Sequence, residues 1–225
     1  MTIQPVITAD GSITLFLPEL NEHYHSIHGA VQESMHIFIN SGYSQIRVFP
    51  ARIFEAGLGT GLNSFLTFLA SEKAGTPVHY TTIEKFPLED NIFRLLNYPE
   101  MTDPAKTKTF KAIHDAPWGQ DTRISEYFTL HKIKGDLREV QLQDSAYDLV
   151  YFDAFGPDVQ PELWTEEIFN MLYHSMKESA CLVTYSVKGS VKRALKAAGF
   201  SLEKLPGPPG KREITRATKK ETHGK

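Results

Sequence analysis

The order of hydrophobic and polar residues along the chain predicts strands and helices in alternation. Short apolar runs rich in β-branched or aromatic residues predict strands at residues 52–56, 78–84, 128–133, 147–152 and 180–186. Apolar residues spaced three and four apart predict helices at residues 62–73, 88–96, 165–176 and 190–198. Because a tight turn cannot join parallel neighbours, this alternation predicts an α/β fold with a doubly wound, mostly parallel sheet.

The N-terminal part of the chain breaks this alternation. Residues 6–17 are apolar on both sides of Asp10-Gly11, which is a strong signal for a β-hairpin. Residues 28–40 carry an apolar stripe with helical spacing. Further along, residues 97–120 are polar and predict mainly loop.

The C-terminal part also departs from the pattern. Residues 200–205 and 213–217 predict a last pair of strands around a segment rich in Pro and Gly. We therefore expect three parts, namely an N-terminal hairpin and helix extension, a sheet domain and a basic, disordered tail, over residues 1–45, 46–217 and 218–225.

The composition is that of a folded globular chain. Of the 225 residues, 41% are hydrophobic and 23% are charged. Cys181 is the only cysteine, which excludes a disulfide within the chain and a thiolate zinc cluster and favours a reducing compartment. No apolar run approaches the roughly 20 residues that span a bilayer, and residues 1–20 lack the features of a secretory signal. We therefore expect a cytoplasmic protein with no membrane segment.

The small net charge of −3 hides an uneven distribution of charge. Residues 188–225 carry 11 Lys and Arg against 3 Asp and Glu, whereas residues 1–187 carry 13 against 24. A basic C-terminal region on an acidic body indicates an anionic partner, for which nucleic acid is the obvious candidate. A solvated tail is the alternative, and it accounts better for residues 219–225 than for residues 188–211.

A glycine-rich turn follows the first predicted strand of the sheet. It reads Glu55-Ala56-Gly57-Leu58-Gly59-Thr60-Gly61-Leu62-Asn63, directly before a helix. Glycine has no Cβ, so such a turn can press its backbone against a ligand. Dinucleotide sites have G-x-G-x-x-G spacing, whereas G-x-G-x-G after an acid is typical of class I S-adenosylmethionine-dependent methyltransferases. There the acid, here Glu55, faces the charged amino-acid end of the ligand. A turn with a purely structural role is the alternative.

Acidic residues also follow the ends of two further strands. Glu84 lies 23 residues beyond Gly61, close to the position at which nucleotide-binding sheets bring a carboxylate to the ribose hydroxyls. Asp136 follows the third strand, where an acid can accept a hydrogen bond from the adenine amino group. A turn or helix-cap role is the alternative for Asp136. With Glu55, these acids predict a ligand that contains adenosine.

The fourth strand, Tyr147–Phe152, delivers Asp153 to its carboxyl end. Ligands of doubly wound sheets bind at this edge, and in a methyltransferase this position lies beside the transferable methyl group. A carboxylate there suits an amine acceptor, because it attracts the ammonium form and accepts a proton from it. Asp153 is therefore the predicted catalytic residue.

Three histidines, His23, His25 and His28, cluster near the N-terminus. No carboxylate-histidine spacing typical of a zinc site accompanies them, so no metal is predicted. Hydrogen bonds to a bound ligand or to local backbone are the more plausible role for these rings.

Several motifs together resemble one family, the methyltransferase half of the bifunctional MnmC proteins. They are Tyr24-His25-Ser26, Gly29-Ala30 and Glu33-Ser34, the glycine turn, Asp153-Ala154-Phe155 with Pro157 and Pro161, Leu163-Trp164-Thr165, Thr184-Tyr185-Ser186, Val191–Leu195, Ala198-Gly199-Phe200 and Pro206–Glu213. Gly156 stands where the family pattern has Ala. The resemblance covers about residues 8–217.

The resemblance implies the class I methyltransferase fold and transfer of a methyl group from S-adenosylmethionine to the aminomethyl group of the tRNA wobble uridine. The product is 5-methylaminomethyluridine or its 2-thio form. Bifunctional members add an FAD-dependent oxidase domain; this sequence ends before one could begin, so we expect the stand-alone version. Its implied cofactor-binding residues are Glu55, Gly57, Gly59, Gly61, Asn63, Glu84, Asp136, Gly29 and Glu33. Of these, Gly29 and Glu33 are expected to close over the methionine end of the cofactor, and Asp153 is expected to face the amine.

The same resemblance implies RNA contacts in the basic region. We expect phosphate contacts from Lys188, Lys192, Arg193, Lys211 and Arg212, because each neutralised phosphate adds affinity that falls with salt. Phe155 or Trp164 is a candidate to stack on the extruded base, with core packing as the alternative. Two other functions stay open, a methyltransferase for a small amine or polyamine, and a non-catalytic module that binds tRNA or a partner.

Overall fold

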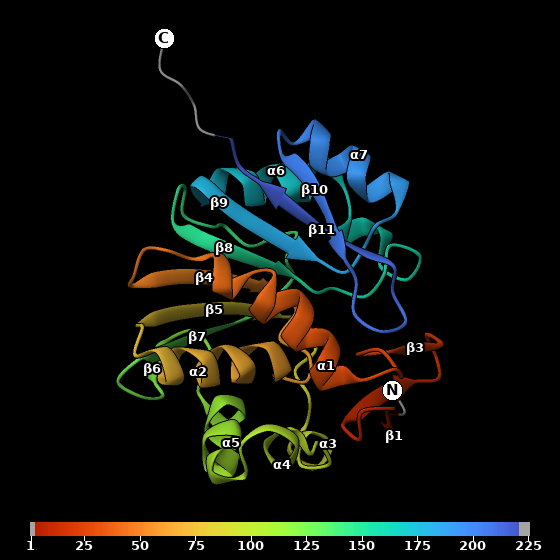
Figure 1. The fold of residues 1–225 in the computed structure, drawn as a ribbon, viewed down its shortest axis with the longest axis vertical. Helices are drawn as coiled ribbons and strands as arrows, with labels where there is room; N and C mark the ends of the chain where they lie inside the picture. Colours follow the sequence, from red (N-terminus) through yellow and green to blue (C-terminus); the bar gives the residue numbers. More distant parts are fainter. Residues whose placement is uncertain (1–2, 221–225) are drawn as a thin grey trace.

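The protein is described by a computed structural model over residues 3–220, which form two sheets (Figure 1). The larger sheet has the strand order β10-β11-β9-β8-β4-β5-β7-β6, in which neighbours from β9 to β7 pair in parallel. The bounds of these eight strands are β4 (Ala51–Ala56), β5 (Val78–Glu84), β6 (Asp121–Arg123), β7 (Phe128–Lys134), β8 (Tyr147–Phe152), β9 (Met176–Thr184), β10 (Ser201–Pro206) and β11 (Glu213–Thr218). The predicted α/β class with a mostly parallel sheet is confirmed.

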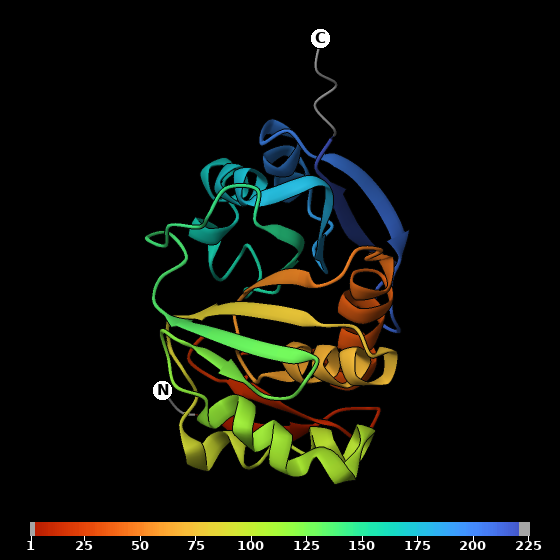
Figure 2. The same ribbon diagram turned by 90° about the vertical axis from the view of Figure 1, so that its left-hand side faces the viewer.

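Helices cover both faces of the large sheet (Figures 1 and 2). One face is covered by α1 (Ala30–Ser34), the π-helical η1 (Met35–Asn40), α2 (Leu62–Ala74) and α5 (Thr107–Asp115). The other face is covered by α6 (Glu166–Ser175) and α7 (Gly189–Ala197). Shorter helical turns are η2 (Tyr43–Gln45), α3 (Asp90–Phe93), α4 (Tyr98–Thr102), η3 (Pro104–Lys106) and η4 (Pro161–Leu163).

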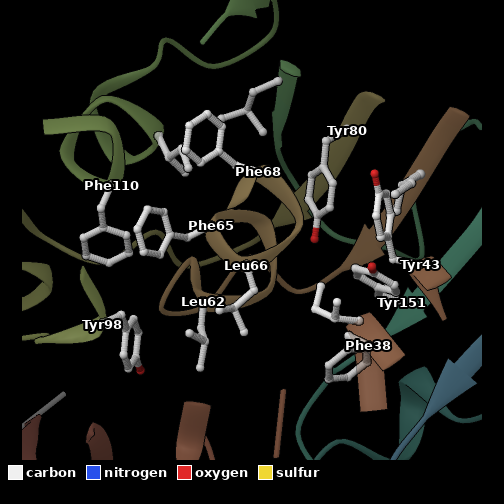
Figure 3. Packing of buried hydrophobic residues seen from close by; sticks show 14 of the residues in the cluster. Phe38, Tyr43, Leu62, Phe65, Leu66, Phe68, Tyr80, Tyr98, Phe110 and Tyr151 are labelled. Carbon is white, nitrogen blue, oxygen red and sulfur yellow. The ribbon is translucent and has the colours of Figure 1, made fainter. Parts of the chain in front are cut away.

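Alternation along the buried strands explains the two layers of helices. Ile53 and Phe54 are neighbours on β4, yet they belong to two different core clusters, and Tyr151 and Phe152 of β8 divide in the same way. Successive side chains of a strand point to opposite faces, so a strand buried on both sides must be apolar throughout. Aromatic rings dominate the core beneath α2, as Figure 3 shows for Phe65, Phe68, Tyr80, Phe110 and Tyr151.

The strand order reverses beside β4. The chain goes from β4 to β5 on one side and returns later to β8 on the other side. Loops leaving the carboxyl ends of two such strands diverge to opposite faces and leave a crevice between them. The predicted ligand-binding edge is therefore the end of β4 and β8, where the glycine turn and Asp153 follow.

The N-terminal hairpin is confirmed as β1 (Gln4–Ile7) and β2 (Ile13–Leu17), to which β3 (Glu22–His23) adds a third strand. Asn97 ties this small sheet to the domain. Its Oδ1 accepts from Ile13 N at 2.7 Å and its Nδ2 donates to the Gly11 carbonyl at 3.0 Å. In Figure 2 the red N-terminal segment accordingly lies beside the green helices.

Two segments differ from the prediction. The helix expected at residues 88–96 is only the short α3, and the segment expected to be loop, residues 97–120, contains α4 and α5. Helix α5 is polar overall and buries only Phe110 and Ile113, although its apolar residues gather on one face. Helix α5 is nevertheless stable because these two residues reach the core beside α2.

The boundary of the expected tail also lies further along the chain. Thr218 still belongs to β11, where it pairs with Cys181 of β9. The Lys219 amide donates to the Ala180 carbonyl at 2.9 Å. Residues 221–225 of that expected tail lie outside the described residues. Within residues 3–220, each helix is too short or too polar to cross a membrane.

Candidate active site

A cavity of about 1050 Å³ lies at the carboxyl ends of β4, β5, β7 and β8. Its lining comes from the glycine turn, the strand ends, the segment between β3 and α1, and the loop between β10 and β11. The N-terminal extension and the C-terminal hairpin thus form walls of this cavity. The sheet forms its floor.

The glycine turn has the backbone geometry that its sequence predicts. Gly57, Gly59 and Gly61 have φ angles of 93°, 50° and 73°. A Cβ at Gly61 would come within 2.8 Å of His114 Nε2, and one at Gly59 within 3.2 Å of the Tyr24 ring. Positive φ and close neighbours both disfavour a side chain at these positions. The turn therefore offers bare backbone to the cavity, which Gly57 and Gly59 line.

Two histidines hold the middle of this turn in place. His25 Nε2 lies 2.7 Å from Thr60 Oγ1, and His114 Nε2 lies 3.1 Å from the Thr60 carbonyl oxygen. Burial lowers the pKa of each ring to about 4, so both are neutral near pH 7. His25 was marked in the sequence by its histidine cluster, whereas no sequence signal marked His114, which comes from α5.

Glu84 and Asp136 both line the cavity at the ends of β5 and β7. Glu84 accepts from Gly59 N at 3.0 Å and from Phe86 N at 2.8 Å, so it fixes the glycine turn as well as facing the cavity. Asp136 accepts from Arg138 and from Lys85, and these partners hold the pKa of its carboxyl well below the usual range. Both carboxyl groups therefore face the space in which a nucleoside would lie.

Glu55 lies under the glycine turn with no exposed surface and outside the cavity lining. Its Oε2 accepts from the Thr82 hydroxyl at 2.9 Å. Burial and then repulsion from Asp153 raise the pKa of Glu55 well above its usual value. The Glu55 contact to the amino-acid end of a ligand stays a prediction.

Asp153 lies on the cavity wall beyond the end of β8. Its Oδ2 accepts from Asn63 Nδ2, at the start of α2, at 2.7 Å. Shielding from water and the nearby Glu33 raise the pKa of Asp153 to about 8, against the opposing effects of Asn63 and Lys211. Asn63 itself is buried and reaches the cavity through Asp153.

Of the two residues expected at the methionine end, Glu33 lines the cavity and Gly29 does not. Glu33 accepts from Ser26 N at 2.9 Å through Oε2 and from Lys211 Nζ at 2.5 Å through Oε1. Gly29, with a φ of 141°, packs against the side chain of Asp10 and caps α1. Its close approach is thus to the N-terminal hairpin.

The residues expected to contact RNA fall into two groups. Arg212 lies in a smaller groove of about 480 Å³ with Lys188, which also pairs with Asp158, and Arg193 and Lys192 lie on α7. Lys211 instead reaches into the main cavity as well as this groove. The two spaces share four lining residues, so the groove continues the cavity outward; they are Glu22, Gly156, Tyr185 and Lys211.

The two aromatic candidates for base stacking differ in exposure. Phe155 lines the cavity, with its ring centroid 5.0 Å from that of Tyr24 in an edge arrangement. Trp164 is only 5% exposed, packs on Phe152 and donates from Nε1 to the Phe155 carbonyl at 2.8 Å. Trp164 is therefore a core residue that supports Phe155.

The histidine cluster is dispersed rather than gathered on one ion. His23 packs on Phe16, His25 bonds Thr60 and His28 packs against Gly210. Over the part of the chain that the structure describes, no group of three or more His, Cys, Asp or Glu side chains is arranged to hold a metal ion.

Sequence comparison identifies the class of enzyme to which this fold and this cavity belong. Residues 101–220, more than half of the chain, match the family described as S-adenosyl-L-methionine-dependent methyltransferase. The chain belongs to this family, and its methyl donor is S-adenosyl-L-methionine.

Within this family, the chain is similar to proteins named MnmC. The chain is 30% identical over 211 residues to the tRNA 5-methylaminomethyl-2-thiouridine biosynthesis bifunctional protein MnmC of Pseudomonas entomophila, covering 87% of this chain and 32% of that protein. The MnmC protein of Legionella pneumophila is 29% identical over 241 residues, with 93% and 36% covered. The chain thus spans about a third of the length of these curated relatives.

A solved structure agrees with these relatives. The crystal structure of MnmC2 from Aquifex aeolicus superposes with a TM-score of 0.76 at 27% identity, covering 97% of this chain and 70% of that one. The predicted resemblance to an MnmC-like methyltransferase is confirmed.

Proposed function

We propose that this protein methylates the aminomethyl nitrogen of 5-aminomethyluridine, or its 2-thio form, at the wobble position of tRNA. The product is the corresponding 5-methylaminomethyl nucleoside. The observation that carries the proposal is that Asp153, oriented by a 2.7 Å hydrogen bond from Asn63, lines the same cavity as the glycine turn. Similarity to MnmC proteins supports the choice of a tRNA acceptor.

The cavity fits the methyl donor on its sheet side. Bare backbone at Gly57 and Gly59 leaves room for close approach, and the carboxyl groups of Glu84 and Asp136 face the cavity where ribose hydroxyls and an adenine amino group need acceptors. Glu33 and, through the turn, Glu55 are the acids proposed for the methionine end. The bound donor supplies a methyl group on a positively charged sulfur, which is a ready leaving group.

Asp153 is the proposed catalytic residue. An alkylamine has a pKa of about 10 by analogy with lysine, so the acceptor arrives as an ammonium ion and must lose a proton. The raised pKa of Asp153, about 8, makes its carboxylate a better proton acceptor than an ordinary aspartate. Asn63 holds Oδ2, which leaves Oδ1 to orient the amine toward the donor methyl.

The groove beyond the cavity is the proposed path for the RNA. Arg212 and Lys188 line it, and Lys192 and Arg193 lie on the adjoining α7. These cations suit phosphates on either side of an extruded base, which they position without reading sequence. Phe155, on the cavity wall, is the proposed platform for that base.

The test is methyl transfer to tRNA whose wobble uridines carry the aminomethyl group, read by nucleoside mass spectrometry. We expect a gain of one methyl group on that nucleoside that requires the donor and is lost in Asp153→Asn. Cells that lack the protein should accumulate 5-aminomethyluridine. Methylation of a polyamine in preference to this tRNA, or binding of tRNA without any transfer, would contradict the proposal.

A further inference from the structure

Lys211 has a different environment from the other cations of the basic region. Its ammonium lies 2.5 Å from Glu33 Oε1 and 4.3 Å from the ring centroid of Tyr185. The side chain is 31% exposed and the Glu33 side chain only 9%, so the ion pair is largely withdrawn from water. Arg212, the next residue, is exposed in the outer groove.

The backbone of the β10–β11 loop directs Lys211 inward. Gly207 N donates to the Arg212 carbonyl and Lys211 N donates to the Pro208 carbonyl, which closes a tight turn. A Cβ at Gly207 would lie 2.3 Å from the Lys211 carbonyl oxygen, so only glycine fits there. His36 Nε2 also lies 2.8 Å from the Pro206 carbonyl, which anchors the loop on η1.

Both partners of Lys211 are tied to the wall that bears Asp153. Tyr185 donates its hydroxyl to the Ala154 carbonyl at 2.9 Å, one residue beyond Asp153. Glu33 faces the same cavity as Asp153 and raises the pKa of that carboxyl, whereas Lys211 lowers it. The ammonium of Lys211 therefore offsets the charge of Glu33 beside the proposed base.

We propose that Lys211 is a positioning residue of the methyl-transfer site, which holds Glu33 and neutralises its charge next to Asp153, rather than a contact to tRNA phosphate. The catalytic part of this inference rests on the proposed function. Lys211 counters part of the repulsion that Glu33 exerts on the Asp153 carboxylate, and the phosphate contacts fall to Arg212 and the cations of α7.

Several ionisable groups face Asp153, and their effects on its carboxyl must be distinguished from the effect of Lys211. The charged or acidic ones are Glu33 from α1, Glu55 from β4 and Lys211 from the β10–β11 loop. Neutral tyrosine hydroxyls also interact with it, from Tyr80, Tyr98 and Tyr185. Of the charged groups, only Glu33 is paired with Lys211, so a double variant of these two isolates the pair.

The experiment is an NMR titration of the Asp153 carboxyl in the free protein labelled with ¹³C-aspartate, with Asp153→Asn to assign the signal. We expect Lys211→Met to move the Asp153 midpoint to higher pH and Lys211→Arg to leave it near the wild-type position. Glu33→Gln should move it to lower pH, and Glu33→Gln with Lys211→Met should return it toward wild type. Arg212→Met is the matched control and should not move it.

Kinetics supply the second readout. At saturating donor and tRNA, Lys211→Met should lower the single-turnover rate at pH 7 by about three- to tenfold, as expected for the loss of one nearby favourable charge. Raising the pH should recover that loss. The salt dependence of tRNA binding should be unchanged in Lys211→Met and weaker in Arg212→Met, since only the latter contacts phosphate.

An Asp153 midpoint that does not move in Lys211→Met, with a weakened salt dependence of tRNA binding, would overturn the inference and return Lys211 to the phosphate contacts. A midpoint that moves in Lys211→Met but is not restored by Glu33→Gln would also overturn it. The titration needs no methyl transfer, so failure of the wild-type protein to methylate tRNA would refute the proposed function alone.

Discussion

The side-chain amide of Asn63 donates a 2.7 Å hydrogen bond to Oδ2 of Asp153, across 90 residues of sequence. Asn63 lies in the first turn of α2, the helix that follows the glycine turn, and Asp153 follows a neighbouring parallel strand. One side chain thus connects the element proposed to hold the methyl donor with the carboxyl proposed to face the acceptor. Removal of this hydrogen bond should affect the rate of catalysis and the affinity for the cofactor differently.

Replacing Asp153 should stop turnover without removing the cofactor site. Asp153→Asn keeps the size of the side chain but cannot accept a proton, so we expect kcat to fall by about 10²- to 10⁴-fold, the usual contribution of a general base. The Kd for S-adenosylmethionine, measured by calorimetry, should stay within a few-fold. Retention of full activity in the methyl-transfer assay would refute the catalytic assignment.

Replacing Asn63 should weaken the positioning of Asp153. In Asn63→Ala the carboxyl loses the donor that lowers its pKa, so we expect a lower rate at pH 7 and a rate profile displaced to higher pH. Thr67→Val is the matched control, because Thr67 is buried one turn further along α2 and bonds the Asn63 carbonyl rather than Asp153. An equal displacement in both variants would point to general damage to α2.

Glu84 should control affinity for the methyl donor. Glu84→Ala removes the acceptor of Gly59 N and the carboxylate proposed for the ribose hydroxyls. Loss of one hydrogen bond to a charged group costs about 1.5–3 kcal/mol, so the Kd for S-adenosylmethionine should rise about tenfold or more. Glu100→Ala, on the exposed side of α4, is the control. An unchanged Kd in Glu84→Ala would exclude the ribose contact.

The raised pKa of Asp153 also predicts how stability depends on pH. The folded protein binds a proton at this group up to about pH 8, whereas an unfolded aspartate releases it near pH 4. Stability from Asp153 is therefore complete below about pH 4 and is lost as the pH rises to about 8. Asp153→Asn should be progressively more stable than wild type over that range in urea unfolding.

The control for this prediction is Asp158→Asn, since the Asp158 side chain is 82% exposed. It should show no such gain across the same pH range. A stability difference between Asp153→Asn and wild type that does not change with pH would show that the carboxyl has an ordinary pKa in the folded protein.

The cations of α7 should determine how tRNA binding depends on salt. Lys192→Ala with Arg193→Ala removes two proposed phosphate contacts, and each should lower the slope of log Kd against log salt by about 0.7–0.9. Lys73→Ala, at the end of α2 away from the groove, should leave the slope unchanged. A slope that is unchanged in the double variant would move the RNA path off α7.

What the sequence could predict was set by local signals. The glycine turn, Glu84 and Asp153 were predictable because each follows a short apolar strand, and parallel strands bring their carboxyl ends to one edge. Helix α5 was missed because residues 97–120 are polar overall, although Phe110 and Ile113 mark one apolar face within them. With α5, the contact of His114 to the glycine turn was missed as well.

Such local signals could not predict contacts between distant parts of the chain. Lys211 and Glu33 are 178 residues apart, and composition placed Lys211 with the basic residues of the C-terminal region. Its pairing depends on a tight turn at Gly207 that turns one lysine inward and its neighbour outward. Charge counts cannot distinguish two adjacent cations that face opposite sides of a loop.

The contacts of the β10–β11 loop to α1 and η1 join segments from the two ends of the described chain at the wall of the cavity that Asp153 also lines. Deletion of the last hairpin should consequently release Glu33 and His36 from this loop and open that wall to bulk water. A fusion partner at the N-terminal end would be held near the cavity, which Ile3 lines, whereas β11 runs away from the cavity toward the opposite edge of the sheet. An engineered version of this enzyme should therefore carry its tag after β11.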